Sequence, residues 1–419
     1  MNLTNIAVIE SIVEQHAEEA AFLWILRDAA VQAPHYSLKD LADLDERVEA
    51  HIDGLRIAED VGWSICADAL AQEEPGEVFV AAVLAFESGQ DQRIKMVLKA
   101  AATDQELSRG LISALGWLRF DQVKEHIDQL LQSVAPELRR IGIAVSAVHR
   151  QDPGSTLVDA LNDEDTFLKA RAIRAAGELG RIDLLPMLKN QLASEDKECQ
   201  FWAGWSAVLL GDRGDALEFL KTLATSESPF QESALNLTLR VMDNTSAQNW
   251  LKEMSQQPDW LRYTVIGAGV AGDPVRIPWL IEHMEMPELA RVAGEAFTII
   301  TGVDLAYEDL EGEWLEGFEA GPTEEPEDED VEMEPDEDLP WPEPKLIREW
   351  WDNNINAFRN GTRYLLGQPI SPEHFQQVLR VGLQRQRAAA AIEFTMTHNQ
   401  PLFEVRAPGF RQKQILGLK

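Results

Sequence analysis

The 419-residue sequence contains only two cysteines, Cys66 and Cys199, which are far apart and have apolar neighbours. Two isolated thiols provide neither a disulfide framework nor the ligand set of a structural zinc site. We therefore predict that both are buried free thiols. The sequence also lacks a long, uncharged apolar run and a basic stretch before its first apolar residues, so neither a membrane span nor a cleaved signal is indicated. A soluble cytoplasmic protein is expected.

Motifs for common catalytic chemistry are missing as well. The sequence contains no G-x-S-x-G, no P-loop and no zinc-protease motif, and none of its eight histidines has a partner at metal-binding spacing. Paired carboxylates are so frequent in this acidic chain that they indicate nothing. We therefore predict no catalytic residue, no cofactor and no metal, and hence no enzyme.

Basic residues are few, with 37 Lys and Arg against 72 Asp and Glu, and the formal net charge is -35. The deficit is uneven, because residues 323–344 carry twelve acids and no base, whereas residues 345–419 have a net charge of +6. A body this acidic repels nucleic acids and anionic lipids at long range. A nucleic-acid partner is not expected, and any contact with a polyanion would be confined to residues 345–419.

Apolar residues recur at helical spacing almost throughout the chain, which indicates an all-α protein. Three short segments resemble one another: ALGWLR at 114–119, AAGELG at 175–180 and GAGVAG at 267–272. The separations of their central glycines, Gly116, Gly177 and Gly269, are two and three times a period of about 30.5 residues. Each period reads as two helices with a break of Gly, Asp or Pro, and such a period predicts a stacked helical solenoid of HEAT-like repeats.

The segment RYTVIGAGVAGD (262–273) also fits the pattern G-x-G-x-x-G of dinucleotide-binding loops. That fingerprint requires a preceding strand and a helix that begins at the glycines. Here Asp273-Pro274 follows the third glycine directly, so the glycines are expected to end a helix. We interpret the motif as a packing element of the repeat, and expect no bound nicotinamide or flavin.

These patterns divide the chain into four parts. We predict an N-terminal helical cap (1–60), a solenoid (61–305), an acidic, Pro-rich linker (306–344) that is mobile and extended from about residue 319, and a basic, mainly helical C-terminal module (345–419). In the cap, Ser37 and Asp40 have the spacing of a capping box at the start of a helix.

Three stretches together resemble a known family: EQHAEEAAFLWILRDAAVQAPHYSLKDLADLDERVEAHIDGLR, the Gly-Asp-Pro repeats, and FRNGTRYLLGQPIS with GLQRQRAAAAIEF. The sequence is similar to a proteobacterial family of conserved hypothetical proteins with HEAT-like repeats, often encoded near type VI secretion genes. The resemblance implies an accessory role in effector loading, delivery or protection, and it transfers no functional residue.

The densest polar cluster of the cap contains His35, Tyr36, Asp43, Arg47 and His51. On a helix, the last three stand one turn apart and could form a ladder of charge-assisted hydrogen bonds. The cluster is either a partner-binding or catalytic face, or an ion-paired surface that holds the cap to the first repeat. We favour the second interpretation.

In the C-terminal module, Trp350 and Trp351 alternate with arginines, including Arg363. Such a pattern can stack nucleic-acid bases or contact a protein. More often, aromatic residues form the core of a small module, and we favour a core role here too.

The sequence thus predicts a non-enzymatic scaffold that binds another protein through its repeats, with candidate contacts at the cap and C-terminal residues named above. The partner would be a secretion component or an effector. Two alternatives remain: an immunity-type protein that neutralises an effector, and an enzyme of unknown reaction with a site in the cap or in the C-terminal module. The oligomeric state is not predicted.

Overall fold

The computed structural model describes residues 8–313, 334, 336–398 and 400–418. The chain forms two compact units. Unit 1 comprises residues 1–210 together with 379–419, and unit 2 comprises residues 211–378. The described residues contain 22 α-helices and one hairpin of two-residue strands, so the protein is all-α, as predicted.

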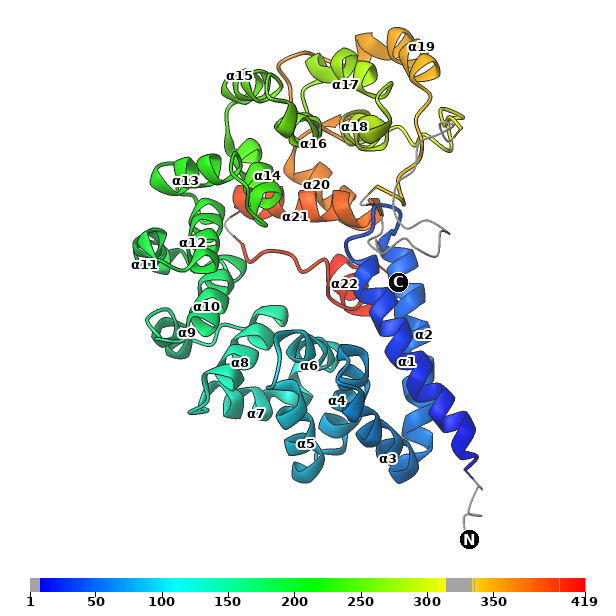
Figure 1. Cartoon of the computed structure of the whole chain (residues 1–419), viewed down its shortest axis with the longest axis vertical. Coiled ribbons are helices and arrows are strands. Elements are labelled where there is room, and N and C mark those ends of the chain that lie inside the picture. Colours follow the sequence, from blue (N-terminus) through cyan, green and yellow to red (C-terminus); the bar gives the residue numbers. More distant parts are fainter. Residues whose placement is uncertain (1–7, 314–333, 335, 399, 419) are drawn as a thin grey trace, which may run out of the picture. The chain divides into compact units, whose positions relative to one another are not determined.

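Unit 1 contains fourteen of these helices and the end of one more, α20 (Pro372–Val381), which begins in unit 2 (Figure 1). They are α1 (Glu10–Ala30), α2 (Leu38–Ile57), α3 (Glu59–Ala69), α4 (Pro75–Ser88), α5 (Asp91–Ala101), α6 (Gln105–Trp117), α7 (Phe120–Leu131), α8 (Pro136–Val148), α9 (Ser155–Ala160), α10 (Thr166–Glu178), α11 (Leu185–Asn190), α12 (Lys197–Leu209), α21 (Gln384–His398) and α22 (Gly409–Leu416).

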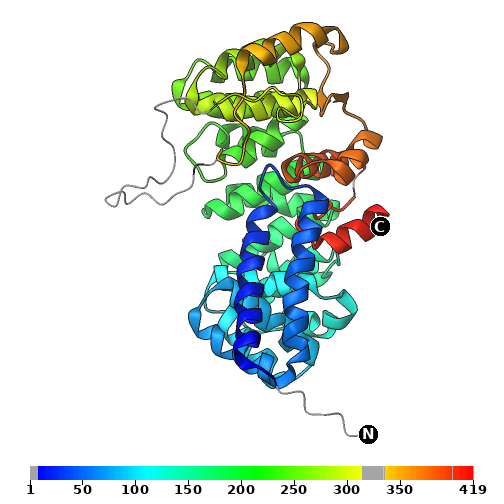
Figure 2. The same cartoon turned by 90° about the vertical axis from the view of Figure 1, so that its right-hand side faces the viewer.

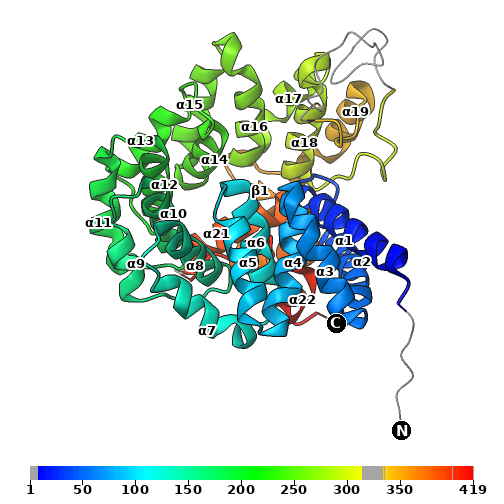
Figure 3. The ribbon, with the colours of Figure 1, turned by 60° about the horizontal axis from the view of Figure 1, so that its bottom comes forward.

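The repeat is set by helix-start residues that recur along the sequence. Helices α4, α6, α8, α10 and α12 begin at a regular spacing that agrees with the predicted period. Proline opens α4 and α8, while the side chains of Asp104, Asp165 and Asp196 accept hydrogen bonds from the first turns of α6, α10 and α12. Consecutive members of this series pack against each other, and helices α5, α7, α9 and α11 follow them in alternation (Figure 3).

Small residues let the repeat helices approach closely. A Cβ atom added to Gly177 would lie 2.7 Å from the Ser206 Cβ on α12. In unit 2, one added to Gly269 would lie 3.0 Å from the Ala296 Cα. Residues 262–271 belong to helix α16, and Gly272 ends it with a left-handed φ of 68°. The segment GAGVAG is therefore a packing element and helix end, and it lies within a helix instead of following a strand.

The N-terminal cap is a pair of helices, α1 and α2, which lie side by side (Figure 2). The predicted capping box is present, since Ser37 Oγ accepts from the Asp40 N–H and the Asp40 carboxylate accepts from the Ser37 N–H. Helix α1 begins at Glu10.

The C-terminal residues complete unit 1 by packing on this cap. Asp45, buried on α2, accepts hydrogen bonds from Arg27 Nε at 2.9 Å and from the Gly409 N–H at 2.5 Å. Arg27 Nη2 also donates to the carbonyls of Arg406 and Ala407. Removing either charged partner would leave the other buried and unpaired.

Unit 2 continues the alternation of helices. Its elements are α13 (Asp215–Leu223), α14 (Gln231–Val241), α15 (Asn244–Met254), α16 (Leu261–Ala271), α17 (Ile277–His283), α18 (Pro287–Thr301), α19 (Pro344–Asn354), β1 (Tyr364–Leu365) and β2 (Gln368–Pro369). The two strands are antiparallel, with Tyr364 opposite Pro369. The core of this unit unites α17, α18 and α19 with Tyr364.

The unit boundaries differ from the predicted domain boundaries. Residues 345–378 belong to unit 2 and residues 379–419 to unit 1. Of the predicted linker, residues 314–333 and 335 lie outside the described residues. Its last part packs on unit 2 instead of extending, because the buried Asp336 accepts two hydrogen bonds from Arg262, each 2.6 Å long, and Leu339 is buried.

Candidate functional site: an arginine-lined groove

The cap residues named from the sequence do not form the expected ladder. Asp43 and Arg47 are exposed on α2, and no hydrogen bond or ion pair joins either to the other or to His51 within the described chain. His51 Nδ1 instead lies 3.2 Å from His16 Nδ1, and burial together with His16 lowers the pKa of His51. His35 is exposed, with its ring 4.7 Å from that of the half-buried Tyr36.

The aromatic residues named in the C-terminal part lie in or against the core of unit 2. Trp351 is 4% exposed, and the half-buried Trp350 packs edge-on against Phe297 on α18. Arg363 Nη1 donates to the Arg240 carbonyl at 2.9 Å. Trp351 is therefore too deeply buried to stack on a base.

Groups suited to metal binding or nucleophilic chemistry are not brought together in the part of the chain that is described. Among those residues, no three His, Cys, Asp or Glu side chains are placed to hold a metal ion. Both cysteines are buried, and burial raises the pKa of each thiol to about 12, which keeps it protonated at neutral pH. Within the described residues, no helix is long and apolar enough to cross a bilayer.

A groove of about 350 Å³ lies within unit 1. Its walls come from α6, α8, α10 and α12, with residues of α1 and of the segment 404–408 at its side. These helices start one repeat period apart, so the groove is lined by equivalent faces of successive repeats. An extended surface of this kind is where solenoid proteins bind their ligands.

Equivalent positions of three successive repeats place an arginine in the groove. Arg109, Arg140 and Arg171 follow one another at the repeat period, and the next position in the register is Trp202. One residue at the same position of each helix projects from the same face, because the repeats stack with the same orientation. The groove therefore carries a row of guanidinium groups that ends at an indole.

Most carboxylates of the groove are already paired with arginine. Arg109 binds Asp28 at 2.5 Å and Glu106 at 2.8 Å. Glu404 pairs with Arg150 at 3.1 Å. The exposed Glu198 accepts a hydrogen bond of 3.3 Å from the indole of Trp202.

Glu178 is held between two arginines at the end of α10. Its carboxylate accepts from Arg171 at 3.0 Å and from Arg174 at 2.7 Å. Burial alone would raise the pKa of Glu178, but the two guanidinium groups prevail and lower it to about 2. The carboxylate is therefore ionised at neutral pH and fixes both arginines in the groove wall.

Two arginines of the groove pair with no described carboxylate, and one nitrogen of a third arginine has no described hydrogen-bond partner. Arg140 Nη2 donates to Ser108 Oγ at 2.7 Å, and Arg140 forms no ion pair with a described residue. Arg171 Nη1 is buried without a hydrogen-bond partner among the described groups. The side chain of Arg406, which also lines the groove, likewise pairs with no described carboxylate. A buried donor without a partner is destabilising, so this site favours an incoming acceptor.

Aromatic side chains complete the groove. Phe167, one of the residues that line the groove, is 54% exposed. The guanidinium of Arg174 stacks on Trp202, with its carbon 4.5 Å from the ring centroid. The groove thus offers both cationic and apolar contacts.

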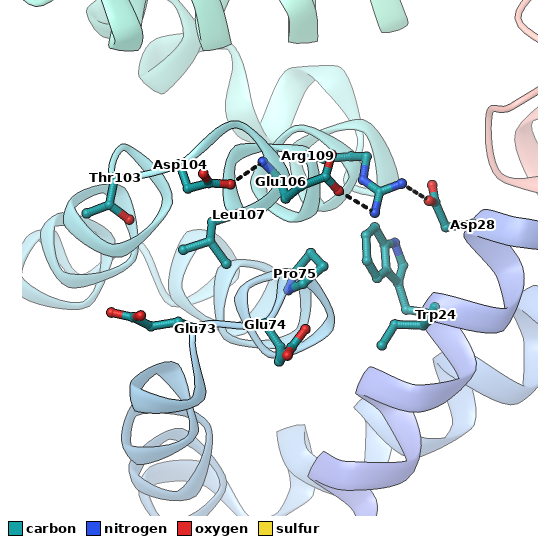
Figure 4. A pocket seen from close by; sticks show the side chains of 11 residues that line it. Trp24, Asp28, Glu73, Glu74, Pro75, Thr103, Asp104, Glu106, Leu107 and Arg109 are labelled. Atoms are coloured by element: carbon teal, nitrogen blue, oxygen red, sulfur yellow. Dashed lines mark hydrogen bonds and ion pairs between the residues drawn. The ribbon is translucent and has the colours of Figure 1, made fainter. Parts of the chain in front are cut away.

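A second hollow of about 590 Å³ adjoins the groove and shares Asp28, Glu106 and Arg109 with it. Figure 4 shows Arg109 between the two carboxylates, and Glu73 and Glu74 on the opposite wall of the hollow. The lining of this hollow is more acidic than that of the groove, because Arg109 is the only basic residue among those that line it. Its charge is already matched by two acids.

Sequence reasoning missed these residues, although one signal was available. The spacing of the arginines is the repeat period itself, and a comparison of positions across the repeats finds it directly. The residues predicted from the sequence, among them His35, His51, Trp350 and Trp351, follow from residue type, and residue type carries no information about position within a repeat.

Comparisons with known proteins agree with the repeat architecture. Residues 154–240 match a family model described as HEAT repeats, so the repeats are HEAT-like. No curated protein matches the chain. One solved structure, described as an engineered protein, shares 15% sequence identity with this chain. The alignment covers 69% of this chain and 94% of the engineered chain, and the TM-score of 0.30 is too low to support an inference.

The fold therefore defines a helical-repeat protein with HEAT-like repeats. Repeats of this class commonly mediate protein interactions, and the fold is compatible with a protein-binding scaffold.

Proposed function

We propose that this protein is a non-enzymatic scaffold that binds a partner protein through the groove of unit 1. One observation carries the proposal: equivalent positions of successive repeats place Arg109, Arg140, Arg171 and Trp202 along a single groove. A stacked surface with regularly spaced contacts suits an extended protein segment better than a small substrate, which needs an enclosed pocket.

The chain itself gives an example of a segment bound in this way. Residues 402–407 run along unit 1 and are held mainly through their backbone. The Leu402 N–H donates to the Glu178 carbonyl at 2.8 Å, and Arg27 donates to the carbonyls of Arg406 and Ala407. The same kinds of groups would hold a partner segment.

The finer assignment rests on the family resemblance of the sequence. On that basis the partner is a component or effector of type VI secretion, and the scaffold acts in the cytoplasm in effector loading or delivery. The groove supports the general part of the proposal, which is the binding of a protein.

The test is capture of partners from a native lysate by the tagged full-length protein. The double variant Phe167→Ser/Trp202→Ser removes two aromatic side chains from the groove. The control, Val134→Ser/Met96→Ser, replaces two exposed residues that do not line it.

We expect the wild type and the control to capture the same protein and the groove variant to lose it. If no protein is captured reproducibly, or if the groove variant captures it equally well, the proposal is wrong.

A further inference from the structure

We infer that the groove of unit 1 recognises an acidic, partly apolar peptide segment, whose carboxylates bind Arg140, Arg171 and Arg406. This inference rests on the proposed function and specifies the chemistry of the partner. It starts from the distribution of ion pairs in the groove.

Most carboxylates of the groove form ion pairs with arginine, whereas two of its arginines form none with a described residue. Asp28, Glu106, Glu178 and Glu404 are all in ion pairs. Arg140 and Arg406 pair with no described carboxylate. Glu198, which also lines the groove, forms no ion pair within the described chain and is hydrogen-bonded to the Trp202 indole. A ligand in the groove therefore meets two guanidinium groups, those of Arg140 and Arg406, with which no described carboxylate pairs, although the whole chain has a net charge of -35.

The geometry favours hydrogen-bond acceptors. Arg171 Nη1 is buried and has no partner among the described groups, while Nη2 of the same guanidinium is occupied by Glu178 and by the Ala144 carbonyl. Arg140, one repeat earlier, uses Nη2 for the hydroxyl of Ser108. A carboxylate between the two helices would accept a charge-assisted hydrogen bond from Arg140, and the buried Nη1 of Arg171 would join it only after the guanidinium turns toward the groove.

The apolar part of the inference comes from Phe167 and Trp202. Phe167 exposes half of its surface at the rim, and Trp202 lies one period beyond Arg171. A segment in which acids alternate with apolar residues would contact the arginines and the aromatic rings together. Inorganic phosphate would satisfy the arginines alone.

The overall negative charge of the chain does not prevent such binding. At physiological ionic strength, salt screens exposed charges over about 8 Å, which weakens long-range repulsion. Contacts inside a partly buried groove are at hydrogen-bond distance and are screened much less. Recognition is therefore set by the groups in the groove.

The test is the binding of labelled, capped ten-residue peptides to the full-length protein, measured by fluorescence anisotropy. One peptide alternates Glu with Leu, and the other replaces each Glu with Gln. We expect the Glu peptide to bind at least about tenfold more tightly, since a hydrogen bond between charged groups is worth a factor of about ten or more.

Variants locate the contact. Arg140→Gln should weaken the Glu peptide by about tenfold or more and leave the Gln peptide unchanged. The matched control is Arg119→Gln, because Arg119 is 75% exposed, lies outside the groove and loses the same charge. Circular dichroism melting of both variants shows whether they remain folded.

Three outcomes would overturn the inference: equal binding of the two peptides, no binding of the Glu peptide, or displacement of that peptide by inorganic phosphate at a comparable concentration. After any of these three outcomes, the scaffold proposal still stands if the wild type captures a partner protein and the groove variant Phe167→Ser/Trp202→Ser does not. If the groove variant captures the partner as well as the wild type does, while the Glu peptide binds more tightly than the Gln peptide, the proposed function is wrong and the inferred peptide preference of the groove stands.

Discussion

Units 1 and 2 both place a later segment of the chain on the ends of repeat helices, but they bind it with different groups. In unit 2, the Tyr364 N–H donates to the Gly272 carbonyl at the end of α16 at 2.8 Å, and Tyr364 and Leu365 are buried. In unit 1, the Leu402 N–H donates in the same way to the Glu178 carbonyl at the end of α10. Around Leu402, however, arginines and carboxylates surround an open groove.

The two units therefore use the same repeat architecture differently. In unit 2 the later segment (Tyr364 and Leu365) covers the helix ends and forms a sealed surface, whereas in unit 1 the groove stays open. Aromatic residues that lose most of their accessible surface stabilise unit 2 through burial. The groove arginines Arg109, Arg171 and Arg174 are only partly buried, because full burial would cost a guanidinium group its hydration, so that region stays accessible. The accessible region is the one available to a partner.

The largest expected effect comes from removing the main aromatic residue of the sealed surface. Trp351→Ala should lower the free energy of unfolding of unit 2 by about 3–5 kcal/mol, since it leaves a cavity beside Phe358 and α17. Denaturant unfolding measures the loss, and hydrogen exchange localises it to α17 and α18. The groove variant Phe167→Ala should change stability by no more than about 0.5 kcal/mol, because the ring is largely exposed. Similar losses in both variants would remove the contrast between the units.

A smaller effect depends on pH and belongs to unit 1. His149 ends α8 with its Nε2 2.9 Å from the Leu115 carbonyl. Burial and the charge of Arg411 lower the pKa of His149 to about 4, from 6.5. The unfolded chain therefore takes up a proton between pH 6.5 and 4 that the folded chain does not, so stability is complete above pH 6.5 and falls as the pH decreases through this window.

The fall should be roughly 3 kcal/mol, since each unit of pKa shift corresponds to about 1.4 kcal/mol. His149→Gln should remove this part of the pH dependence, and the exposed His398→Gln should not. Urea titrations at several pH values measure it. A wild type with constant stability from pH 6.5 to 4 would contradict the prediction.

The smallest effect tests the feature that the two units share. Gly269→Leu should cost about 1–3 kcal/mol, because its side chain would overlap Ala296 on α18. Gly177→Leu, which meets Ser206 in unit 1, should cost a similar amount. Gly214→Leu is the control, since a Cβ there meets only the Asp212 side chain at 3.4 Å. Thermal unfolding of the three variants tests the order, and an equally large loss at Gly214 would refute the packing role.

Much of the local architecture was predictable from the sequence. The capping box of Ser37 and Asp40 and the helix end at Gly272 follow from residue types at fixed spacing, because both depend on hydrogen bonds within a few residues. The repeat period followed from glycines at equivalent positions. At Gly177 and Gly269 the neighbouring helix leaves no room for a larger side chain.

The residues of the candidate site could not be predicted from the sequence as well as the fold could. Asp45 and Asp43 lie two positions apart in one acidic stretch, yet Asp45 is buried against Arg27 and Asp43 is exposed. The ladder of Asp43, Arg47 and His51 had suitable spacing, but spacing alone does not decide which rotamers are occupied. The division of residues 345–419 between the two units depends on contacts between segments that are distant in the chain.

The sequence by itself determined the class of fold, the repeat period and several helix ends, because these depend on periodic apolar residues and on local hydrogen bonds. Only the tertiary structure decided which charges are matched. Arg109, Arg140 and Arg171 have the same place in three repeats, but one is paired with two acids, one with a hydroxyl and one with Glu178. The pairs of Arg109 with Glu106 and of Arg171 with Glu178 lie within one helix, but the contacts of Arg109 with Asp28 and of Arg140 with Ser108 join different helices. The latter depend on distances of a few ångströms that exist only once the helices have packed together.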